Sequence, residues 1–224
     1  MTPNGVPATI EPFRKDLLEW AESNLRNFPW RDDSISVYEM FVAEFFLTQT
    51  PAENTADVYP EFLDRYPALE HVREASQAEL AEMIEPIGFQ HMRADALAEI
   101  ASEYDELPTD VEELLQLPRV GPYVANATLC FALDRRLPVV DRNVNRVYSR
   151  VFGDEYPDGD ADRREFALES LPEDGAIART YNLALLDFGA MVCTKQAPRC
   201  SECFAREYCS YYQSVVADGE NLDA

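Results

Sequence analysis

Lysine is nearly missing from this chain, because Lys15 and Lys195 are its only two among 224 residues. Long apolar runs are missing as well, and none approaches the roughly 20 residues that a membrane-spanning helix needs, so we expect a soluble protein with no membrane partner. Alternation of valine or isoleucine with polar residues is almost absent, which argues against a β-rich fold. No repeat, low-complexity tract or Gly/Ser linker interrupts the chain, which is long enough to bury a substantial core in one or two domains.

Acidic residues outnumber basic ones by 42 to 19, and the formal net charge is -23. The acidic residues are spread along the chain, which predicts a solvated acidic surface suited to high salt. A cationic partner would account for the same charge. Taken alone, the charge argues against a nucleic-acid partner.

The local distribution of charge points the other way. Residues 117–152 carry six arginines against two aspartates, Asp134 and Asp141. A basic segment in so acidic a chain is a candidate phosphate-binding surface. Arginines paired with neighbouring carboxylates on helix surfaces would give the same composition. The arginines are residues 119, 135, 136, 142, 146 and 150.

The sequence predicts an all-α fold. Glutamate, alanine, leucine and arginine dominate, and apolar positions recur at spacings of three and four. Ser76 with Glu79 and Asp110 with Glu113 have the spacing of helix caps. Prolines 60, 67, 86, 108, 118, 138, 157 and 172 are expected between helices. The expected helices cover residues 12–27, 36–50, 53–64, 77–84, 91–103, 110–116, 122–132, 143–152, 162–170 and 176–189.

Four of the five cysteines stand within seventeen residues, at Cys193, Cys200, Cys203 and Cys209. The chain is long for a disulfide-rich secreted domain and opens without a signal peptide, so we expect reduced thiols and a metal. Structural zinc sites mostly use two Cys-x-x-Cys pairs, whereas this segment has one. One loop around a [4Fe-4S] cluster fits better, with zinc and unligated thiols as alternatives. Cys130 lies in an apolar run and is expected in the core.

Leu117-Pro118-Arg119-Val120-Gly121 lies between two expected helices. A helix, a tight glycine turn and a second helix can present backbone N–H groups and a helix start to a phosphate. The same turn could merely join two core helices.

Two carboxylates have unusual settings. Asp141 follows an apolar run and begins a basic helix, where the helix N-terminus and Arg142 should favour its charged form, although a simple N-cap would look the same. Glu44 shares an apolar helix face, where burial would raise its pKa and suit it to act as a general acid, or would tie it to structural partners. A charged aspartate with a protonatable glutamate is the pair that cleaves glycosidic bonds, here the bond between base and deoxyribose of a flipped nucleotide.

These motifs together resemble the helix-hairpin-helix DNA glycosylases of the endonuclease III and MutY group. The likeness runs from about residue 13 to 211. The shared motifs are Leu-Pro-Arg-Val-Gly (117–121), Val-Val-Asp-Arg-Asn-Val-Asn-Arg-Val (139–147) and Cys-x6-Cys-x2-Cys-x5-Cys (193–209). The segments Phe-Pro-Trp-Arg (28–31), Glu-Phe-Phe-Leu-Thr-Gln-Thr (44–50) and Leu-Asp-Phe-Gly-Ala-Met-Val-Cys (186–193) look like MutY.

The resemblance implies two helical lobes with a DNA-binding cleft between them. The expected lobes are a six-helix barrel with the hairpin over residues 31–136, and an iron–sulfur cluster lobe formed by residues 1–30 and 137–213. A disordered acidic tail is expected over residues 214–224.

The resemblance also implies roles for individual residues. Asp141 would stabilise or capture the sugar cation, and Glu44 would protonate the departing base or handle the water. Gln49 would fill the gap left by the flipped nucleotide, and Phe89 and Gln90 would wedge the opposite strand, unless these loop residues only pack locally. The expected contacts to the DNA backbone are Leu117, Arg119, Val120, Gly121, Arg142 and Arg146, with Lys195 and Arg199 from the loop between Cys193 and Cys200.

Two departures from the family pattern bear on the activity. Bifunctional members have a lysine two residues after Gly121 that attacks the sugar, and this chain has Tyr123, so base removal without efficient strand cleavage is expected. We expect Tyr123, together with Asp141 and Glu44, to be a catalytic residue. Arg119 replaces the first glycine of the hairpin, which puts the ideal turn geometry in doubt but adds a phosphate donor.

The layout predicts a monofunctional mismatch glycosylase. MutY enzymes also carry a C-terminal domain, whereas this sequence runs about fifteen residues beyond Cys209, so we expect its layout to be closer to that of short archaeal enzymes that remove thymine or uracil opposite guanine. Alternatives are adenine removal opposite guanine or oxidised guanine, an endonuclease III-like activity on damaged pyrimidines, and a non-catalytic iron–sulfur DNA-binding or redox sensor. We expect a monomer that binds double-stranded DNA holding a mismatched or damaged base, in the nucleoid-associated cytoplasm of a high-salt prokaryote.

Overall fold

The computed structural model describes residues 7–32 and 34–216. Every regular element in these two stretches is helical, which confirms the all-α prediction. Within the same stretches no helix combines the length and the apolar character that crossing a membrane demands. Contacts between Cα atoms divide the chain into two compact units. We call residues 27–133 the hairpin unit, and residues 1–26 with 134–224 the cysteine unit.

Two buried helices form the centre of the hairpin unit. Helix α2 (Val37–Leu47) buries all residues from Met40 to Phe46, and α8 (Pro122–Leu133) buries those from Val124 to Phe131. Because both are apolar on nearly every side, they pack against each other in the interior. Around them lie α3 (Ala52–Arg65), α4 (Leu69–Glu74), α5 (Gln77–Ile84), α6 (Gln90–Glu103), α7 (Val111–Leu114) and the 3-10 turns η1 (Pro29–Arg31) and η2 (Glu85–Ile87).

Local signals set several helix starts in this unit. Ser76 and Glu79 form a reciprocal capping box at the start of α5, and the Asp110 carboxylate accepts from the N–H groups of Glu112 and Glu113. Two expectations were wrong. Pro60 lies inside α3 rather than between helices, and α4 was not anticipated because six residues are too few to show a periodic pattern.

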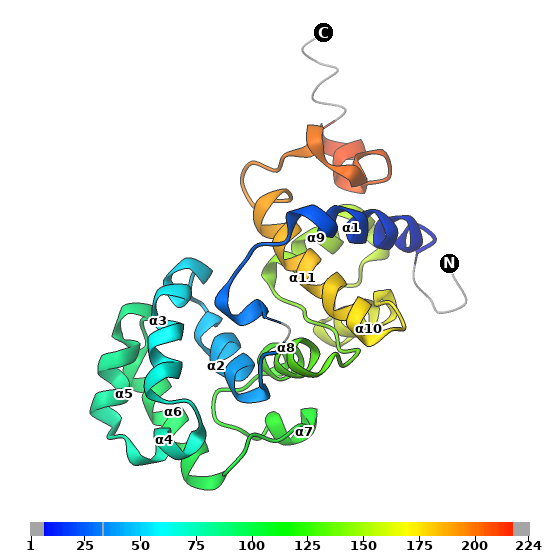
Figure 1. Cartoon of the computed structure of the whole chain (residues 1–224). Helices are drawn as coiled ribbons and strands as arrows, with labels where there is room; N and C mark the ends of the chain where they lie inside the picture. The colour runs from blue at the N-terminus through cyan, green and yellow to red at the C-terminus, as the bar shows by residue number, and fades with distance from the viewer. Residues whose placement is uncertain (1–6, 33, 217–224) are drawn as a thin grey trace. The chain divides into compact units, whose positions relative to one another are not determined.

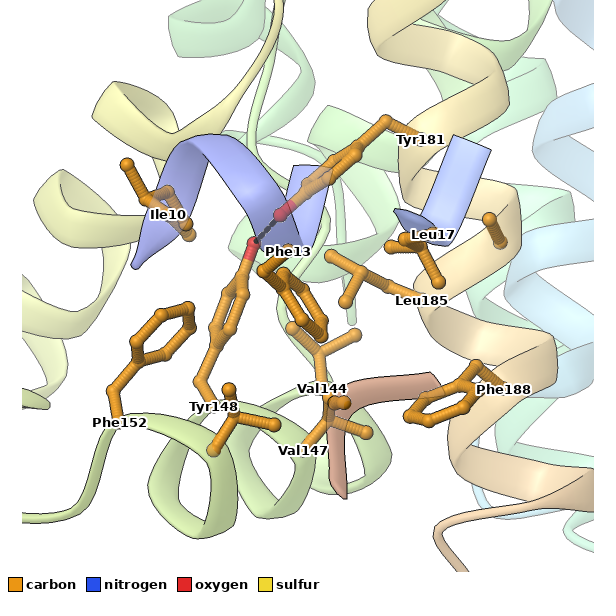
Figure 2. Packing of buried hydrophobic residues seen from close by; sticks show 14 of the residues in the cluster. Ile10, Phe13, Leu17, Val144, Val147, Tyr148, Phe152, Tyr181, Leu185 and Phe188 are labelled. Atoms are coloured by element: carbon orange, nitrogen blue, oxygen red, sulfur yellow. Dashed lines mark hydrogen bonds between the residues drawn. The ribbon is translucent and has the colours of Figure 1, made fainter. Parts of the chain in front are cut away.

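The cysteine unit is built on three long helices and an aromatic core. Helices α1 (Ile10–Asn24) and α9 (Arg142–Phe152) both pack against α11 (Gly175–Met191) (Figure 1). Figure 2 shows Phe13, Tyr148 and Phe188 in the core that these helices share. The remaining elements are α10 (Asp160–Ser170) and the short turns η3 (Gly153–Glu155), η4 (Cys200–Glu202), η5 (Phe204–Glu207) and η6 (Tyr212–Val216).

A buried tyrosine pair lies within this core. The Tyr148 hydroxyl donates to the Tyr181 hydroxyl at 3.3 Å, and both side chains are fully buried (Figure 2). Burial raises the pKa of both phenols, so each stays protonated at any ordinary pH. The pair therefore satisfies polar groups that α9 and α11 bring into an apolar core.

The expected disordered tail over residues 214–224 needs a correction at its start. Residues 214–216 belong to the π-helical turn Tyr212–Val216. Residues 217–224 lie outside the described residues.

Candidate functional site

Glu44 lies inside the apolar helix α2 of the hairpin unit. The helix begins at a capping box in which the Ser36 N–H donates to the Glu39 carboxylate at 2.7 Å and the Glu39 N–H donates to the Ser36 hydroxyl at 3.2 Å. The Glu44 side chain is 2% exposed, between the buried residues Ala43 and Phe45. The Glu44 carboxyl group is thus shielded from bulk water within the hairpin unit.

Three of the loop residues expected to touch DNA lie around one pocket of the hairpin unit. Gln49 follows α2, Phe89 is the N-cap of α6, and Arg119 lies in the hairpin turn. All three are exposed, Phe89 to 50%. They line a pocket of about 220 Å³. The other lining residues are Phe45, Thr48, Met92 and Arg93.

The backbone at these three residues is strained. Gln49, Phe89 and Arg119 have φ values of 60°, 53° and 65°, in the left-handed region that non-glycine residues seldom adopt. Each such residue costs on the order of 1 kcal/mol, which contacts with its surroundings must offset. Strain gathered around one pocket is typical of a functional surface.

The hairpin turn has the left-handed backbone conformation of a glycine at Arg119, where the family has its first glycine. Arg119, which replaces it, takes the left-handed conformation that a glycine would adopt freely. Leu117 and Val120 are 4% and 8% exposed, and the Val120 N–H donates to the Leu117 carbonyl at 3.2 Å, so these two residues close the turn. The Arg119 side chain and the start of α8, directly after Gly121, are the groups of this turn that could contact a phosphate.

Tyr123 is half-buried in the first turn of α8, two residues after Gly121. A phenol at this place supplies no amine for attack on a sugar.

Arg93 lines the same pocket, and the sequence analysis did not identify it as a site residue. It is 5% exposed, and its guanidinium donates to the carbonyls of Ile87 at 3.0 Å, Phe46 at 3.1 Å and Thr48 at 2.8 Å. A fourth hydrogen bond, of 2.8 Å, goes to the Thr50 hydroxyl. Burial lowers the pKa of the guanidinium.

A signal for Arg93 was present in the sequence. It shares the buried face of α6 with Ala96, Leu97 and Ile100, at the spacings of three, four and seven that mark one side of a helix. An arginine in such a stripe predicts a buried cation that needs partners.

Asp141 is the N-cap of α9 in the cysteine unit. One carboxylate oxygen accepts the Val144 N–H at 2.7 Å, and the other accepts the Asn143 side-chain N–H at 2.9 Å. Asp141 therefore is a helix cap, as the simpler interpretation held, and its half-buried carboxylate is also fixed in orientation. A fixed carboxylate at a helix N-terminus is suited to stabilise a positive charge next to it.

Asn143 and Arg146 connect Asp141 to the loop of cysteines. The side-chain oxygen of Asn143 accepts from Arg146 at 2.8 Å, and Arg146 also donates to the backbone carbonyls of Gly189 at 2.7 Å and Cys193 at 2.8 Å. Arg146 was expected to bind DNA phosphates. Its Nε and Nη2 donors are directed at protein acceptors and connect α9, α11 and the cysteine loop, and its contact with DNA stays a prediction.

Two other arginines of the basic segment also bind backbone carbonyls of distant segments. Arg150 donates to the carbonyls of Thr194 at 2.7 Å and Lys195 at 3.0 Å, and Arg136 donates to those of Leu168 and Pro172. The exposed cations of the cysteine unit that remain for phosphates include Arg135, Arg142, Lys195 and Arg199.

The four cysteines of the terminal segment lie close together. The pKa of the Cys203 thiol is raised to about 11, first by burial and then by the charges of Cys209, Cys193 and Cys200, although the Ala205 N–H lowers it. Burial also raises the pKa of Cys209. In the described part of the chain no three His, Cys, Asp or Glu side chains are arranged to hold a single metal ion. Four soft thiolates in one short segment are the donor set of an iron–sulfur cube, which binds each cysteine to a different iron.

Comparison with known proteins gives a consistent result. Residues 42–173 match the family described as "HhH-GPD superfamily base excision DNA repair protein". The thymine/uracil-DNA glycosylase of Pyrobaculum aerophilum is 34% identical over 95% of this chain and 96% of its own. The adenine DNA glycosylase of Mycolicibacterium smegmatis is 38% identical over 84% of this chain and 66% of its own. The solved structure of a thermostable thymine-DNA glycosylase matches with a TM-score of 0.85 and 30% identity, over 92% of this chain and 97% of that one.

Proposed function

The chain belongs to the HhH-GPD superfamily of base excision DNA repair proteins, and we propose that it is a monofunctional DNA glycosylase removing thymine or uracil opposite guanine. The observation that carries this proposal is the match to a thymine/uracil-DNA glycosylase along almost the whole of both chains. Endonuclease III-like and non-catalytic readings have less support, because a phenol replaces the attacking amine and both carboxylates are present. The partner is double-stranded DNA that contains a mismatched base.

The Asp141 carboxylate is held in a fixed orientation, as stabilisation of the sugar cation requires. Breaking the bond between base and deoxyribose leaves positive charge on the sugar ring, and a carboxylate held in place stabilises that charge without having to reorient. The Val144 N–H and the Asn143 side chain hold the carboxylate through hydrogen bonds of 2.7 and 2.9 Å. Asp141 thus faces the sugar cation until water captures it.

Glu44 supplies the proton. A pyrimidine leaves as an anion unless a proton reaches it, and a buried carboxyl group can deliver that proton and then accept one from the attacking water. Its place in α2, at 2% exposure, keeps bulk water from competing for the proton.

Tyr123 limits the reaction to base removal. Cleavage of the strand by a glycosylase starts when an amine forms a Schiff base with the sugar, and a phenol cannot form one. The product is an abasic site in an intact strand.

The four cysteines would hold a [4Fe-4S] cluster. Cys193, Cys200, Cys203 and Cys209 are soft ligands, and four of them within one short segment are the number that one cube needs. When bound, the cluster supplies four iron–thiolate bonds that fix the loop between Cys193 and Cys209. The chain's own contribution is to present Lys195 and Arg199 on this loop to the DNA backbone.

Adenine removal is the second candidate. The 38% identity to an adenine DNA glycosylase favours it, although the match spans 66% of that protein. One assay separates the two. Duplexes with single G·T, G·U, A·G or oxidised-guanine·A pairs are incubated with the protein in molar potassium chloride and then treated with alkali. Alkali-dependent breaks at thymine or uracil support the proposal, breaks at adenine favour the alternative, and no breaks overturn both.

A further inference from the structure

Two loops of the hairpin unit meet at one guanidinium. The first loop, residues 48–50, carries Gln49, and the second, residues 87–89, carries Phe89; we call them the Gln49 loop and the Phe89 loop. Both hold a non-glycine residue in the left-handed region. Both Gln49 and Phe89 line the pocket that also contains Arg119.

Arg93 is the group that both loops share. It donates to the Thr48 carbonyl and the Thr50 hydroxyl of the first loop, each at 2.8 Å, and to the Ile87 carbonyl of the second at 3.0 Å. It also donates to the Phe46 carbonyl at the end of α2, where a cation offsets the negative end of the helix dipole. All four acceptors are uncharged, so the guanidinium organises backbone rather than balancing a carboxylate.

Thr50 completes the connection. Its hydroxyl accepts from Arg93 and donates to the Ile87 carbonyl at 3.1 Å, so one side chain bridges the two loops directly. The Arg93 guanidinium also lies 5.7 Å from the centre of the Phe89 ring, within range of a cation–π contact. One partly buried network therefore connects the two loops that carry the strained residues.

We propose that Arg93 is a positioning residue that fixes the Gln49 and Phe89 loops in the shape needed to enter DNA. This inference rests on the proposed function for its DNA part. The loops must replace a flipped nucleotide at once, so their strained shape has to exist before DNA binds. A planar guanidinium with several fixed donors can span both loops, and a lysine ammonium, with its donors on one nitrogen, cannot.

The first measurement concerns the free protein. The Thr50 N–H donates to Leu47 and the Gly88 N–H to Glu85, so exchange of these two amides reports on the two loops. Arg93→Met should speed both exchanges by about tenfold or more, since hydrogen bonds to a charged group are lost. Thr50→Val, which leaves α6 untouched, should speed them by a smaller factor and keeps the test valid if Arg93→Met folds poorly.

Arg73→Met is the matched control. Arg73 lies on α4 of the same unit and likewise donates to backbone carbonyls, those of Ala101 and Tyr104 at the C-terminal end of α6, which do not line the pocket. The control should leave the exchange of Thr50 and Gly88 at the wild-type rate. Unchanged exchange at either loop in both Arg93→Met and Thr50→Val would overturn the inference.

The second measurement uses DNA but not base release. A 2-aminopurine placed beside a G·T pair brightens when its neighbour is unstacked, and saturating wild-type protein should raise that signal. Arg93→Met should give less than half of the rise at saturation, and Arg93→Lys should restore little of it. A full rise with Arg93→Met contradicts the inference. A wild-type protein that raises the signal but releases no base contradicts the proposed function and leaves the inference standing.

Discussion

Asp141 and Arg146 are joined through a single side chain, that of Asn143. The asparagine donates to Asp141 at 2.9 Å and accepts from Arg146 at 2.8 Å, and Arg146 in turn holds the Cys193 carbonyl at 2.8 Å. Anything that shifts Asn143 therefore changes the orientation of the carboxylate. The cysteine loop and the proposed catalytic group are parts of one hydrogen-bonded network.

Gly189→Ala should slow base release without touching a catalytic residue. A Cβ at Gly189 would lie 2.8 Å from the Asn143 Cβ, which forces α9 and α11 apart at the residue that orients Asp141. We expect a single-turnover rate about tenfold lower and a loss of about 1–3 kcal/mol in unfolding free energy from overpacking. Gly159→Ala is the control, because its Cβ would meet the movable end of Asp162. Equal rates in both variants would refute the role of Asn143.

Asp141→Asn should abolish base release and leave DNA binding within about a factor of ten, since the change removes charge but little shape. The helix should survive because asparagine caps a helix as well as aspartate does. Asp174→Asn makes the same change at the N-cap of α11, where Asp174 accepts the Ile177 N–H at 3.0 Å, and should keep full activity. Loss of binding in Asp141→Asn alone would contradict the assigned role.

The sequence predicted those features that depend on neighbours along the chain. The capping box at Ser76 and the cap at Asp141 follow from side chains a few residues apart, and both are present. The sequence could not predict that Gln49, Phe89 and Arg119 lie around one pocket. All three have a left-handed backbone, which a sequence usually reveals by a glycine, but none of them is a glycine. The loops that carry them come together only through tertiary contacts.

The roles of the arginines in residues 117–152 also depend on tertiary contacts that the sequence does not reveal. From the composition, all six arginines were candidates for binding phosphates. In the structure Arg136, Arg146 and Arg150 donate to backbone carbonyls of distant segments. A guanidinium on a surface and one that braces two helices look alike in a sequence. Their difference depends on which carbonyls the fold leaves without partners at helix ends.

Cys203→Ala should remove bound iron and also slow base release. Purified wild-type protein should hold about four iron atoms per chain, and the variant close to none, because a cube needs all four thiolates. The rate should fall because the loop that carries Cys193 also receives the Arg146 hydrogen bond. Cys130→Ala, a fully buried cysteine in α8, is the control and should keep its iron. Iron-free wild-type protein with full activity would disprove the cluster proposal.

Lys195 and Arg199 should govern how steeply DNA binding falls with salt. Both are exposed on the cysteine loop, and each phosphate contact they make releases counterions. Lys195→Ala and Arg199→Ala should each reduce the slope of log affinity against log salt by about 0.9, and the double variant by about twice that. Arg65→Ala removes the same charge from the end of α3, where Arg65 pairs with Glu79 at 3.2 Å. Its slope should match the wild type, because net charge alone forms no phosphate contact. If all three single variants lower the slope equally, the loop has no special contact with DNA, and the acidic surface as a whole sets the salt dependence.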